Sequence, residues 1–527
     1  VKCLFIKRLD ETVQNLKYAR MSSVSSQKPT RYRWVICSML FFATTINYLD
    51  RQVLSLLQPL LEEQFHWTDN DYGTITAVFS LFYAISLLFA GRFVDRVGTK
   101  KGYAWAIAIW SFGAALHALC GIVTEHYVGL PDASALRMAQ GADIVSQITM
   151  VSITAFVICR CVLALGEAGN FPAAIKATAE YFPKKDRAFA TGIFNSGANV
   201  GAILAPLTVP VMAEVWGWET AFLVVGAIGF VWLGFWQFIY KSPENNPRMN
   251  AAERAYIEQD QVLEAGTGTI AAKTANGSAS VGVMGVPMVD KGAGMTAEVP
   301  AEEAVADKMT IWQSLHYRQT WAFAVGKFLT DGVWWFFLFW TPAYLKAQYD
   351  MTGTQVAWPI AVLYTITVAG SVFGGKFPTY FINRGMNPYA GRMRAMLIIA
   401  FFPLAVLLAQ PLGYISYWVP ILLIAVGASA HQAWSANIYS TVSDMFPKGA
   451  VATITGIGSM AGGLGSVFIQ KGAGMLFTYS DETRLVFFGF EGKPAGYTIA
   501  FIYCAIAYLL AWAIMKSLVP RYRQIVP

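Results

Sequence analysis

The chain has 527 residues, a formal net charge of +7, 55% hydrophobic residues and only 13% charged residues. Because soluble domains carry about 25% charged residues, a water-soluble fold of this length could not bury so much apolar side-chain surface. No basic patch with interleaved aromatic residues lies outside the apolar segments, and the six scattered cysteines lack metal-ligand spacing, so neither a nucleic-acid partner nor a metal or other cofactor is expected.

Twelve apolar segments follow one another along the chain. A bilayer core needs roughly 20 apolar residues per helix, and these segments are too long and too uniformly apolar to be the strands of a membrane barrel. They begin near Trp34, Tyr72, Gly102, Gln147, Ala188 and Trp218, and then near Thr320, Gln355, Met393, Tyr417, Val451 and Ala495. The sequence therefore predicts an all-α membrane protein with twelve transmembrane helices in two six-helix bundles.

Polar intervals divide the chain further. The expected parts are an N-terminal cytoplasmic tail (1–30), a first six-helix bundle (31–240), a cytoplasmic linker (241–313), a second six-helix bundle (314–518) and a C-terminal tail (519–527). Within the linker, Asn250 to Leu263 is expected to form a short amphipathic helix, and Gly266 to Asp307, rich in small residues, is expected to be flexible. A second long loop, roughly Ile122 to Ser146, is expected after the third helix.

Charge in the short loops predicts the orientation. The loops after the even-numbered helices are basic, and the loop after the second helix, with Arg92, Arg96, Lys100 and Lys101, is the clearest case. The loops after the first and fifth helices are acidic instead. Because positively charged loops stay on the cytoplasmic side, we expect a multi-pass protein of the cell's inner membrane with both termini in the cytoplasm.

Charged residues lie in the middle of two predicted helices. The first helix carries Asp50 and Arg51, and the fourth carries Arg160 and Glu167. A charged side chain at mid-membrane costs roughly 3 kcal/mol or more, so each of the four needs a reason. Arg160 and Glu167 are seven residues apart, which puts them on one helix face about 10 Å apart along the axis.

These four charges sum to zero, and that balance indicates a mechanism. If Asp50 or Glu167 takes up a proton, the cluster gains one positive charge and attracts a monoanion, so a proton and an anion would travel together. The balance is therefore a minimal electrostatic scheme for proton–anion symport. The alternative is that the four residues are permanent ion pairs that set helix packing.

Other polar residues in the helices suit a polyol. Amide and aromatic side chains offer hydrogen bonds and a flat apolar face for a sugar ring. The candidates for substrate binding are Tyr48, Tyr83, Asn195, Asn199, Gln432, Trp434 and Asn437. For Lys327 and Asp331, one turn apart, and for His431, both a structural and a functional role stay open.

The segment Gly91 to Lys101, between the second and third helices, is the sharpest local motif. Its glycines Gly91 and Gly98 permit a tight turn, Asp95 can cap a nearby helix N-terminus or pair with an arginine, and Arg96 follows it. We expect these four residues to form a cytoplasmic latch that stabilises one conformation without touching substrate.

That segment resembles the hallmark motif of the major facilitator superfamily, and its second-half counterpart, Gly374 to Gly385, lacks the acid. More specifically, Tyr48-Leu49-Asp50-Arg51, the pair Arg160 and Glu167, and Gly166 to Pro172 resemble the anion:cation symporter family. The hexuronate branch, which transports glucuronate and galacturonate in bacteria, looks closest.

The resemblance implies a proton-coupled symporter that imports a hexuronate or a related sugar acid by alternating access. It implies that Asp50 and Glu167 carry protons, and that Arg51 and Arg160 handle the substrate carboxylate and the gating pairs. Two departures leave the sugar acid open: Ala198 and Asn199 lie where galactonate carriers place a Gln, and Gly332 stands where hexuronate relatives often have Pro.

Two rival functions remain. The same fold could transport another organic anion, an aldonate or a dicarboxylate, or could serve as a membrane sensor, for which the long linker is the only favourable feature. An enzyme is not expected, because no nucleophile–base or metal constellation lies in any loop. The expected partners are the sugar acid, protons and the lipid bilayer, and the expected state is a monomer.

Overall fold

The computed structural model describes residues 28–446, except 260–308, and residues 448–522 and 525. The chain divides into two compact units. One combines Val1–Cys37, Ala177–Thr191 and Lys241–Ala306, and the other combines Ser38–Lys176, Gly192–Tyr240 and Asp307–Pro527.

Long helices dominate the described residues, which confirms the expected all-α architecture. The first six, with the continuation of the fourth, are α2 (Tyr32–Phe65), α3 (Asp69–Val97), α4 (Thr99–Leu116), α7 (Ala142–Glu167) with α8 (Asn170–Tyr181), α9 (Lys184–Trp216) and α10 (Trp218–Ile239). The second six are α13 (Arg318–Tyr349), α14 (Ala357–Ile382), α15 (Pro388–Phe401) with the 3-10 segment η4 (Phe402–Leu408), α16 (Trp418–Met445), α17 (Lys448–Glu482) and α18 (Lys493–Leu518). All twelve begin within a few residues of the positions expected from hydropathy.

Ten helical segments of the described residues are long and apolar enough to cross a membrane, by length and composition. Helices α2 and α17, with 34 and 35 residues, are also long but fall outside these ten. Their polar content explains this: α2 carries Asp50, Arg51 and several amides in its middle, and α17 is rich in glycine, serine and threonine. The short elements are η1 (His117–Leu119), α5 (Cys120–Val128), α6 (Ala133–Arg137), η2 (Pro243–Asn245), α12 (Ile311–Ser314), η3 (Gly353–Val356) and the hairpin β1 (Val486–Phe487) and β2 (Phe490–Glu491).

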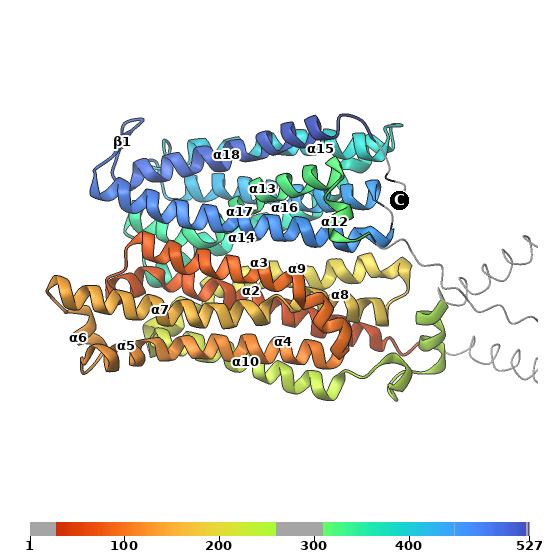
Figure 1. Ribbon diagram of the computed structural model, residues 1–527, viewed down its shortest axis with the longest axis horizontal. Coiled ribbons are helices and arrows are strands. Elements are labelled where there is room, and N and C mark those ends of the chain that lie inside the picture. Colours follow the sequence, from red (N-terminus) through yellow and green to blue (C-terminus); the bar gives the residue numbers. More distant parts are fainter. Residues whose placement is uncertain (1–27, 260–308, 447, 523–524, 526–527) are drawn as a thin grey trace, which may run out of the picture. The chain divides into compact units, whose positions relative to one another are not determined.

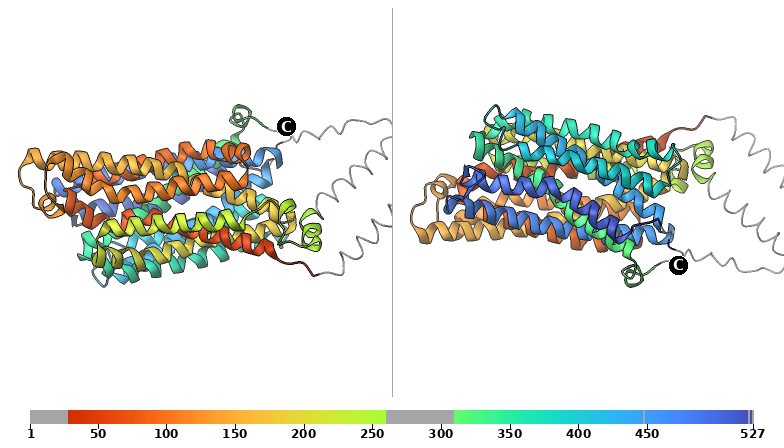
Figure 2. Two further views of the ribbon diagram at one scale, coloured as in Figure 1. Left: turned by 90° about the horizontal axis from the view of Figure 1, so that it is seen from below. Right: turned by 90° about the horizontal axis from the view of Figure 1, so that it is seen from above.

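The long helices of the larger unit run lengthwise beside one another, with α3, α4, α7 and α10 in one group and α13 to α18 in the other (Figures 1 and 2). We call the residues of this unit before 241 the N half and those after 306 the C half. Gly98 and Gly385 turn the chain at corresponding places in the two halves, with φ of +87° and +88°, a region that favours glycine. The end of the helices with these turns is called the motif end, and the opposite end, where α5, α6 and β1 lie, is called the far end.

The loop after the third helix is shorter than expected. The helix runs on through η1 and α5 to Val128, and α7 begins at Ala142, so the expected bounds of Ile122 and Ser146 are wrong. Gly129, with φ of +78°, ends α5, and its N–H donates to the Glu125 carbonyl at 2.9 Å. The polar residues from Thr124 onward end the apolar run without ending the helix.

Glycines allow α3 and α17 to approach closely near the far end. A Cβ added at Gly73 would lie 2.7 Å from the Gln470 carbonyl oxygen, and one at Gly474 would lie 2.5 Å from the Asp69 carbonyl oxygen. Nearer the middle, the hydroxyls of Ser80 and Ser466 lie 3.1 Å apart. Small residues of this kind are typical of closely packed membrane helices.

The same two helix faces separate toward the motif end. Ala84 and Gly463 still touch, since a Cβ added at Gly463 would lie 2.5 Å from the Ala84 Cβ. Two turns further, Gly91 lies on the face of Ala84, and Gly456 lies on the face of Gly463, because seven residues are nearly two full turns. A Cβ added at either would have no neighbour within 4 Å among the described residues. Along α3 and α17, the two halves are therefore in contact at the far end and apart around Gly91 and Gly456, toward the motif end.

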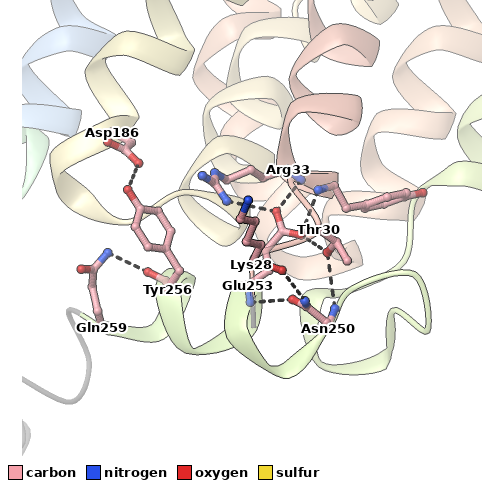
Figure 3. Close-up of polar contacts among 9 residues, drawn as sticks. Lys28, Thr30, Arg33, Asp186, Asn250, Glu253, Tyr256 and Gln259 are labelled. Atoms are coloured by element: carbon pink, nitrogen blue, oxygen red, sulfur yellow. Dashed lines mark hydrogen bonds and ion pairs between the residues drawn. The ribbon is translucent and has the colours of Figure 1, made fainter. Parts of the chain in front are cut away.

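In the smaller unit, a buried carboxylate fastens the linker to the start of α2 (Figure 3). Glu253, fully buried, accepts hydrogen bonds from the backbone N–H groups of Tyr32 and Arg33 at 2.9 and 3.1 Å and from the Thr30 hydroxyl. Its carboxylate also pairs with Arg33 Nη1 at 3.2 Å. Glu253 thus caps the N-terminus of α2 from a distant part of the chain.

The expected amphipathic helix at Asn250 to Leu263 is present as far as it is described, with helical residues 251–259. The Asn250 side chain caps it by accepting the Glu253 N–H at 2.9 Å. Tyr256, on the same helix, donates its hydroxyl to Asp186 Oδ2 at 2.7 Å (Figure 3). The expected flexible segment, Gly266 to Asp307, lies outside the described residues, and the five-part division of the chain stays a prediction.

Candidate functional site

An ion pair between α2 and α7 forms the centre of the candidate site. Arg51 Nε lies 2.9 Å from Glu167 Oε2, and both side chains are buried. Glu167 is the last residue of α7, and α8 starts only at Asn170. Pro172, which lacks an N–H, explains why the helix is interrupted just after Glu167.

Glycines beside Glu167 bring this break against α4. A Cβ added at Gly166 would lie 2.3 Å from the backbone nitrogen of Trp110, and one at Gly169 would lie 2.6 Å from the Ala106 Cβ. These positions therefore need glycine for packing. Since successive helical residues are rotated by about 100°, a Gly166 face fixed against α4 directs Glu167 toward a different neighbour, which is α2.

Aromatic rings surround the Arg51 guanidinium. Its carbon lies 4.7 Å from the ring centres of both Tyr83 and Trp335, 5.1 Å from that of Tyr48 and 5.8 Å from that of Phe79. Cation–π contacts of this kind stabilise a guanidinium that has little access to water. Trp335 comes from α13, so the C half completes the surroundings of a cation in the N half.

Asp50 and Arg160 lie in the same electrostatic network but make no direct pair. Both are buried, and neither the Asp50 oxygens nor the Arg160 nitrogens have a hydrogen-bond partner among the described residues. Asp50 nevertheless interacts electrostatically with Glu167, Arg160 and Arg51. Burying a charge without a partner is costly, so two such groups in one network are unusual for a purely structural role.

The C half carries a comparable pair on one helix. Lys327 Nζ lies 2.6 Å from Asp331 Oδ2, and the same nitrogen lies 4.3 Å from the ring centre of Tyr439. Trp335, one turn after Asp331 on the same helix, lies 4.7 Å from the Arg51 guanidinium of the first pair. The two charged pairs therefore belong to one region between the halves, each with its own internal counter-charge.

The other sequence candidates are placed differently. Asn195 is exposed on α9, while Asn199 on the same face and Gln432 on α16 are half-buried. Trp434 and Asn437 are buried, and Asn437 Nδ2 donates to the Gly374 carbonyl at 2.9 Å inside the C half.

Two of the α16 residues contact α18. Trp434 packs edge-on against the Tyr508 ring, with centroids 5.5 Å apart. His431 bonds through Nδ1 to the Tyr508 hydroxyl at 2.9 Å and stacks on Trp334 at 5.4 Å. These contacts bring His431 and Trp434 together with α18, not with the charges on α2.

At the motif end, Asp95 pairs with Lys176 of α8 at 3.0 Å, and the same ammonium donates to the Val94 carbonyl at 3.1 Å. The partner is thus a lysine, where the sequence suggested an arginine or a helix N-terminus. Arg96 is exposed.

Sequence reasoning missed Phe79, Trp335 and Lys176. A signal existed for two of them. Phe79 lies one turn before Tyr83 on α3, and Trp335 lies one turn after Asp331 on α13, so both share a face with a candidate already identified. Lys176 gave no such signal.

Comparisons with known proteins agree with this architecture. A family model described as Major Facilitator Superfamily matches residues 40–469. Among solved structures, a bacterial homologue of the human lysosomal transporter Spinster, in an inward-facing and occupied conformation, matches with a TM-score of 0.64 at 16% identity, covering 95% of this chain and 100% of that one. A D-xylose–proton symporter matches with a TM-score of 0.61 at 13% identity, covering 94% of this chain and 100% of that one.

Curated proteins are more similar in sequence. The chain is 27% identical to the hexuronate transporter of Escherichia coli K12 over 448 residues, which are 84% of this chain and 87% of that protein. It is 27% identical to the galacturonate transporter of Dickeya chrysanthemi, over 66% of this chain and 82% of that protein. It is 26% identical to a probable galactarate/D-glucarate transporter of Escherichia coli K12, over 88% of this chain and 93% of that protein.

Proposed function

Because the chain belongs to the Major Facilitator Superfamily, and is therefore a multi-pass membrane transporter and not an enzyme, we propose that it imports a hexuronate or a related sugar acid together with protons, by alternating access. The observation that carries this proposal is the four-charge network of Asp50, Arg51, Arg160 and Glu167, in which one pair is formed and two buried groups have no direct partner. Relatives named for hexuronate, galacturonate and galactarate/D-glucarate support the substrate class.

Proton coupling follows from the Arg51–Glu167 pair. While Glu167 is ionised, its carboxylate occupies the guanidinium that a substrate carboxylate would need. A proton on Glu167 breaks this charge pairing and leaves Arg51 free for the substrate. Asp50 makes no direct pair with Arg160, but a proton on Asp50 would likewise remove one negative charge from the network, so that binding of the anion and binding of protons support each other.

The substrate site would combine this cation with aromatic and amide groups. Tyr48, Tyr83 and Trp335 flank Arg51 and offer flat apolar faces to a sugar ring. Asn199 and Gln432, both half-buried, are the amides that we assign to the sugar hydroxyls.

The conformation also fits alternating access. Since the basic loops lie at the motif end, we assign this end to the cytoplasm, together with both termini, and the far end to the outside of the inner membrane. The conformation described here, closed at the far end and splayed at the motif end, would then release substrate inward. The pair Asp95–Lys176, flanked by Gly91 and Gly98, would stabilise the N half at its cytoplasmic end as a latch.

A second candidate is a carrier of an aldonate or a sugar dicarboxylate. The similarity to a probable galactarate/D-glucarate transporter favours it, and so does Lys327, a second cation between the halves that could hold a second carboxylate. In that case the Lys327–Asp331 pair would have to open on substrate binding.

A ligand panel on the purified protein separates these candidates. Thermal stability would be measured with glucuronate, galacturonate, galactonate, galactarate and the neutral sugars glucose and galactose. We expect stabilisation by hexuronates and none by neutral sugars, since a ligand that binds the folded state raises its stability with concentration. Stabilisation by galactarate alone would favour the dicarboxylate, and stabilisation by neutral sugars would contradict an anion site.

A further inference from the structure

Two carboxylates of the N half face two lysines of the C half at the far end. Lys493 at the start of α18 lies 2.9 Å from Asp69 at the start of α3. Lys346 of α13 donates to the Pro59 carbonyl of α2 at 3.1 Å. Glu62, one turn after Pro59, interacts electrostatically with Asp69, Lys493 and Lys346. The four charges sum to zero and come from four helices, two in each half.

In this far-end cluster, defined as Glu62, Asp69, Lys346 and Lys493, Asp69 is buried and the other three residues are half-buried, although the cluster lies near the ends of the helices. Asp69 is only 5% exposed, whereas a single carboxylate at a helix N-terminus is normally solvated. Ion pairs that are largely desolvated depend strongly on both partners being charged, because removing one charge leaves the other buried without compensation.

An aromatic layer separates the cluster from the site around Arg51. Tyr72 of α3 packs on Trp340 of α13 with ring centres 5.1 Å apart, Trp340 on Phe477 of α17 at 4.9 Å, and Phe477 on Tyr497 of α18 at 4.1 Å. The Tyr72 hydroxyl also donates across the halves, to the Phe339 carbonyl at 2.9 Å. Charged and aromatic layers together close the far end.

One face of α2 connects the two charged regions. Asn47, Arg51, Ser55, Gln58 and Glu62 follow one another at intervals of three or four residues, so they form a polar stripe along the helix. At its end, Gln58 Nε2 donates to Glu62 Oε1. The far-end cluster is therefore continuous with the Arg51 site along one polar helix face.

Several other titratable groups lie near the two carboxylates. The titratable side chains that act on Glu62 or Asp69 from packed elements are Tyr72 on α3, Lys346 on α13, Asp481 on α17, and Lys493 and Tyr497 on α18. Asp481 is 60% exposed at 4.0 Å from Lys493, so it is a weak second partner of this lysine. Of these groups, the carboxylates alone change charge between neutral and mildly acidic pH.

We propose that Glu62 and Asp69 form a second proton-responsive site, separate from Asp50 and Glu167. It holds the far end closed while both carboxylates are ionised and releases it when protons from outside neutralise them. The proposal rests on the proposed function, because it takes the far end as the outer face of a proton-driven importer. Protonation of the carboxylates removes the negative charges that balance Lys346 and Lys493. A lower pH outside the cell therefore favours opening of the far end to the outside.

Lys471 provides an internal contrast. It crosses from α17 to α3 at the same end, but its ammonium bonds to the neutral groups Asn70 Oδ1 and Thr74 Oγ1, at 2.6 and 2.7 Å. This bridge does not depend on ionised carboxylates. Its loss should therefore loosen the far end at every pH without removing the response to pH.

The test measures opening directly and needs no transport. Spin labels at Ser134→Cys on α6 and Glu482→Cys at the end of α17, both exposed, report the distance between the halves at the far end by pulsed electron spectroscopy. In the protein that carries only the two labels, we expect two label-to-label distances, a shorter one for the closed far end and a longer one for the open far end. The population with the longer distance should grow as the pH falls from 8 to about 5. The variant with Glu62→Gln and Asp69→Asn should show the longer distance already at pH 8, with no further pH response.

Three controls make the outcome decisive. Glu63→Gln, the same change on the neighbouring exposed side chain, should keep the normal pH response, and Lys471→Ala should lengthen the distance but keep the response. Lys493→Ala removes the same ion pair from the lysine side, so its distances should resemble those of the double variant. A double variant that keeps the normal pH response overturns the proposal. Absence of proton-coupled uptake with an intact pH response would instead overturn the proposed function and leave the gate in place.

Discussion

The Arg51 side chain contacts both halves of the larger unit. It pairs with Glu167 of α7 and lies 4.7 Å from the ring centre of Trp335 of α13. A planar guanidinium can donate to a carboxylate within its plane and stack rings on its faces at the same time, which a lysine ammonium cannot do. The site therefore uses the shape of arginine as well as its charge.

Arg51→Lys tests this point. We expect uptake of a sugar acid to fall about 10- to 100-fold, since one charge-assisted pair and the stacking contacts are worth about 1–3 kcal/mol together. Initial rates in proteoliposomes measure it. Arg254→Lys, on the linker helix, is the matched control and should leave the rate unchanged. Full activity of Arg51→Lys would show that the site needs only a positive charge at position 51 and not the shape of the guanidinium.

Single residues also show what the sequence could and could not reveal. Charges in apolar helices are conspicuous because they are costly, so Asp50, Arg51, Arg160 and Glu167 were identifiable without coordinates. The rings of Phe79 and Trp335 gave a weaker signal, since each lies one turn from an identified candidate, but aromatic residues are common in such helices and only tertiary packing selects the ones beside Arg51. The pairing of Arg51 with Glu167 depends on the packing of Gly166 against α4, which turns Glu167 toward α2.

At the scale of the element, glycine faces decide where helices meet. The Gly73 side of α3 touches α17, and an added Cβ there would lie 2.7 Å from the Gln470 carbonyl oxygen. A Cβ added at Gly472, on the same helix as Gln470, would have no neighbour within 4 Å among the described residues. Hydropathy gave the positions of these helices, but it could not give the faces on which they pack, nor the continuation of the third helix through α5.

Gly73→Val should weaken closure of the far end. The added side chain forces α3 and α17 apart, and overpacking of this kind costs about 1–3 kcal/mol. We expect the spin-label distance between Ser134→Cys and Glu482→Cys to lengthen at pH 8. Gly472→Val, the matched control, should leave the distance as it is. An unchanged distance in Gly73→Val would mean that the close approach is not needed for closure.

The linker helix makes a separate prediction. Glu253→Gln keeps the side-chain shape but removes the charge that caps α2 and pairs with Arg33. Hydrogen bonds to a charged group are worth about 1.5–3 kcal/mol, so we expect a lower melting temperature. Glu258→Gln, exposed on the same helix, should have no such effect. Equal melting temperatures for the two variants would show that the cap contributes nothing to stability.

At the scale of the whole molecule, transport requires the far end to open and close. The Ser80 and Ser466 hydroxyls lie 3.1 Å apart across the halves, a separation that a disulfide between cysteines at these positions could bridge. Oxidation of the Ser80→Cys/Ser466→Cys variant should abolish uptake, and a reductant should restore it, because the bond would hold the far end closed. Either single variant should be insensitive to oxidation. Uptake that continues through the cross-linked protein would contradict movement at this interface.

The architecture at this scale was largely predictable, because hydropathy and loop charge are long-range averages that single packing details do not disturb. The conformation was not. Which end is closed depends on contacts between residues hundreds of positions apart, such as Lys493 with Asp69, and no local pattern indicates them.

The central claim, that a sugar acid and protons move together through the Arg51–Glu167 site, has one direct test. Proteoliposomes loaded with a pH-sensitive dye would receive glucuronate or galacturonate outside, with no imposed gradient. We predict acidification of the lumen on addition of substrate, its loss in Glu167→Gln, and its persistence in Glu244→Gln, an exposed control. Substrate uptake without acidification, or acidification that Glu167→Gln leaves intact, would contradict the account.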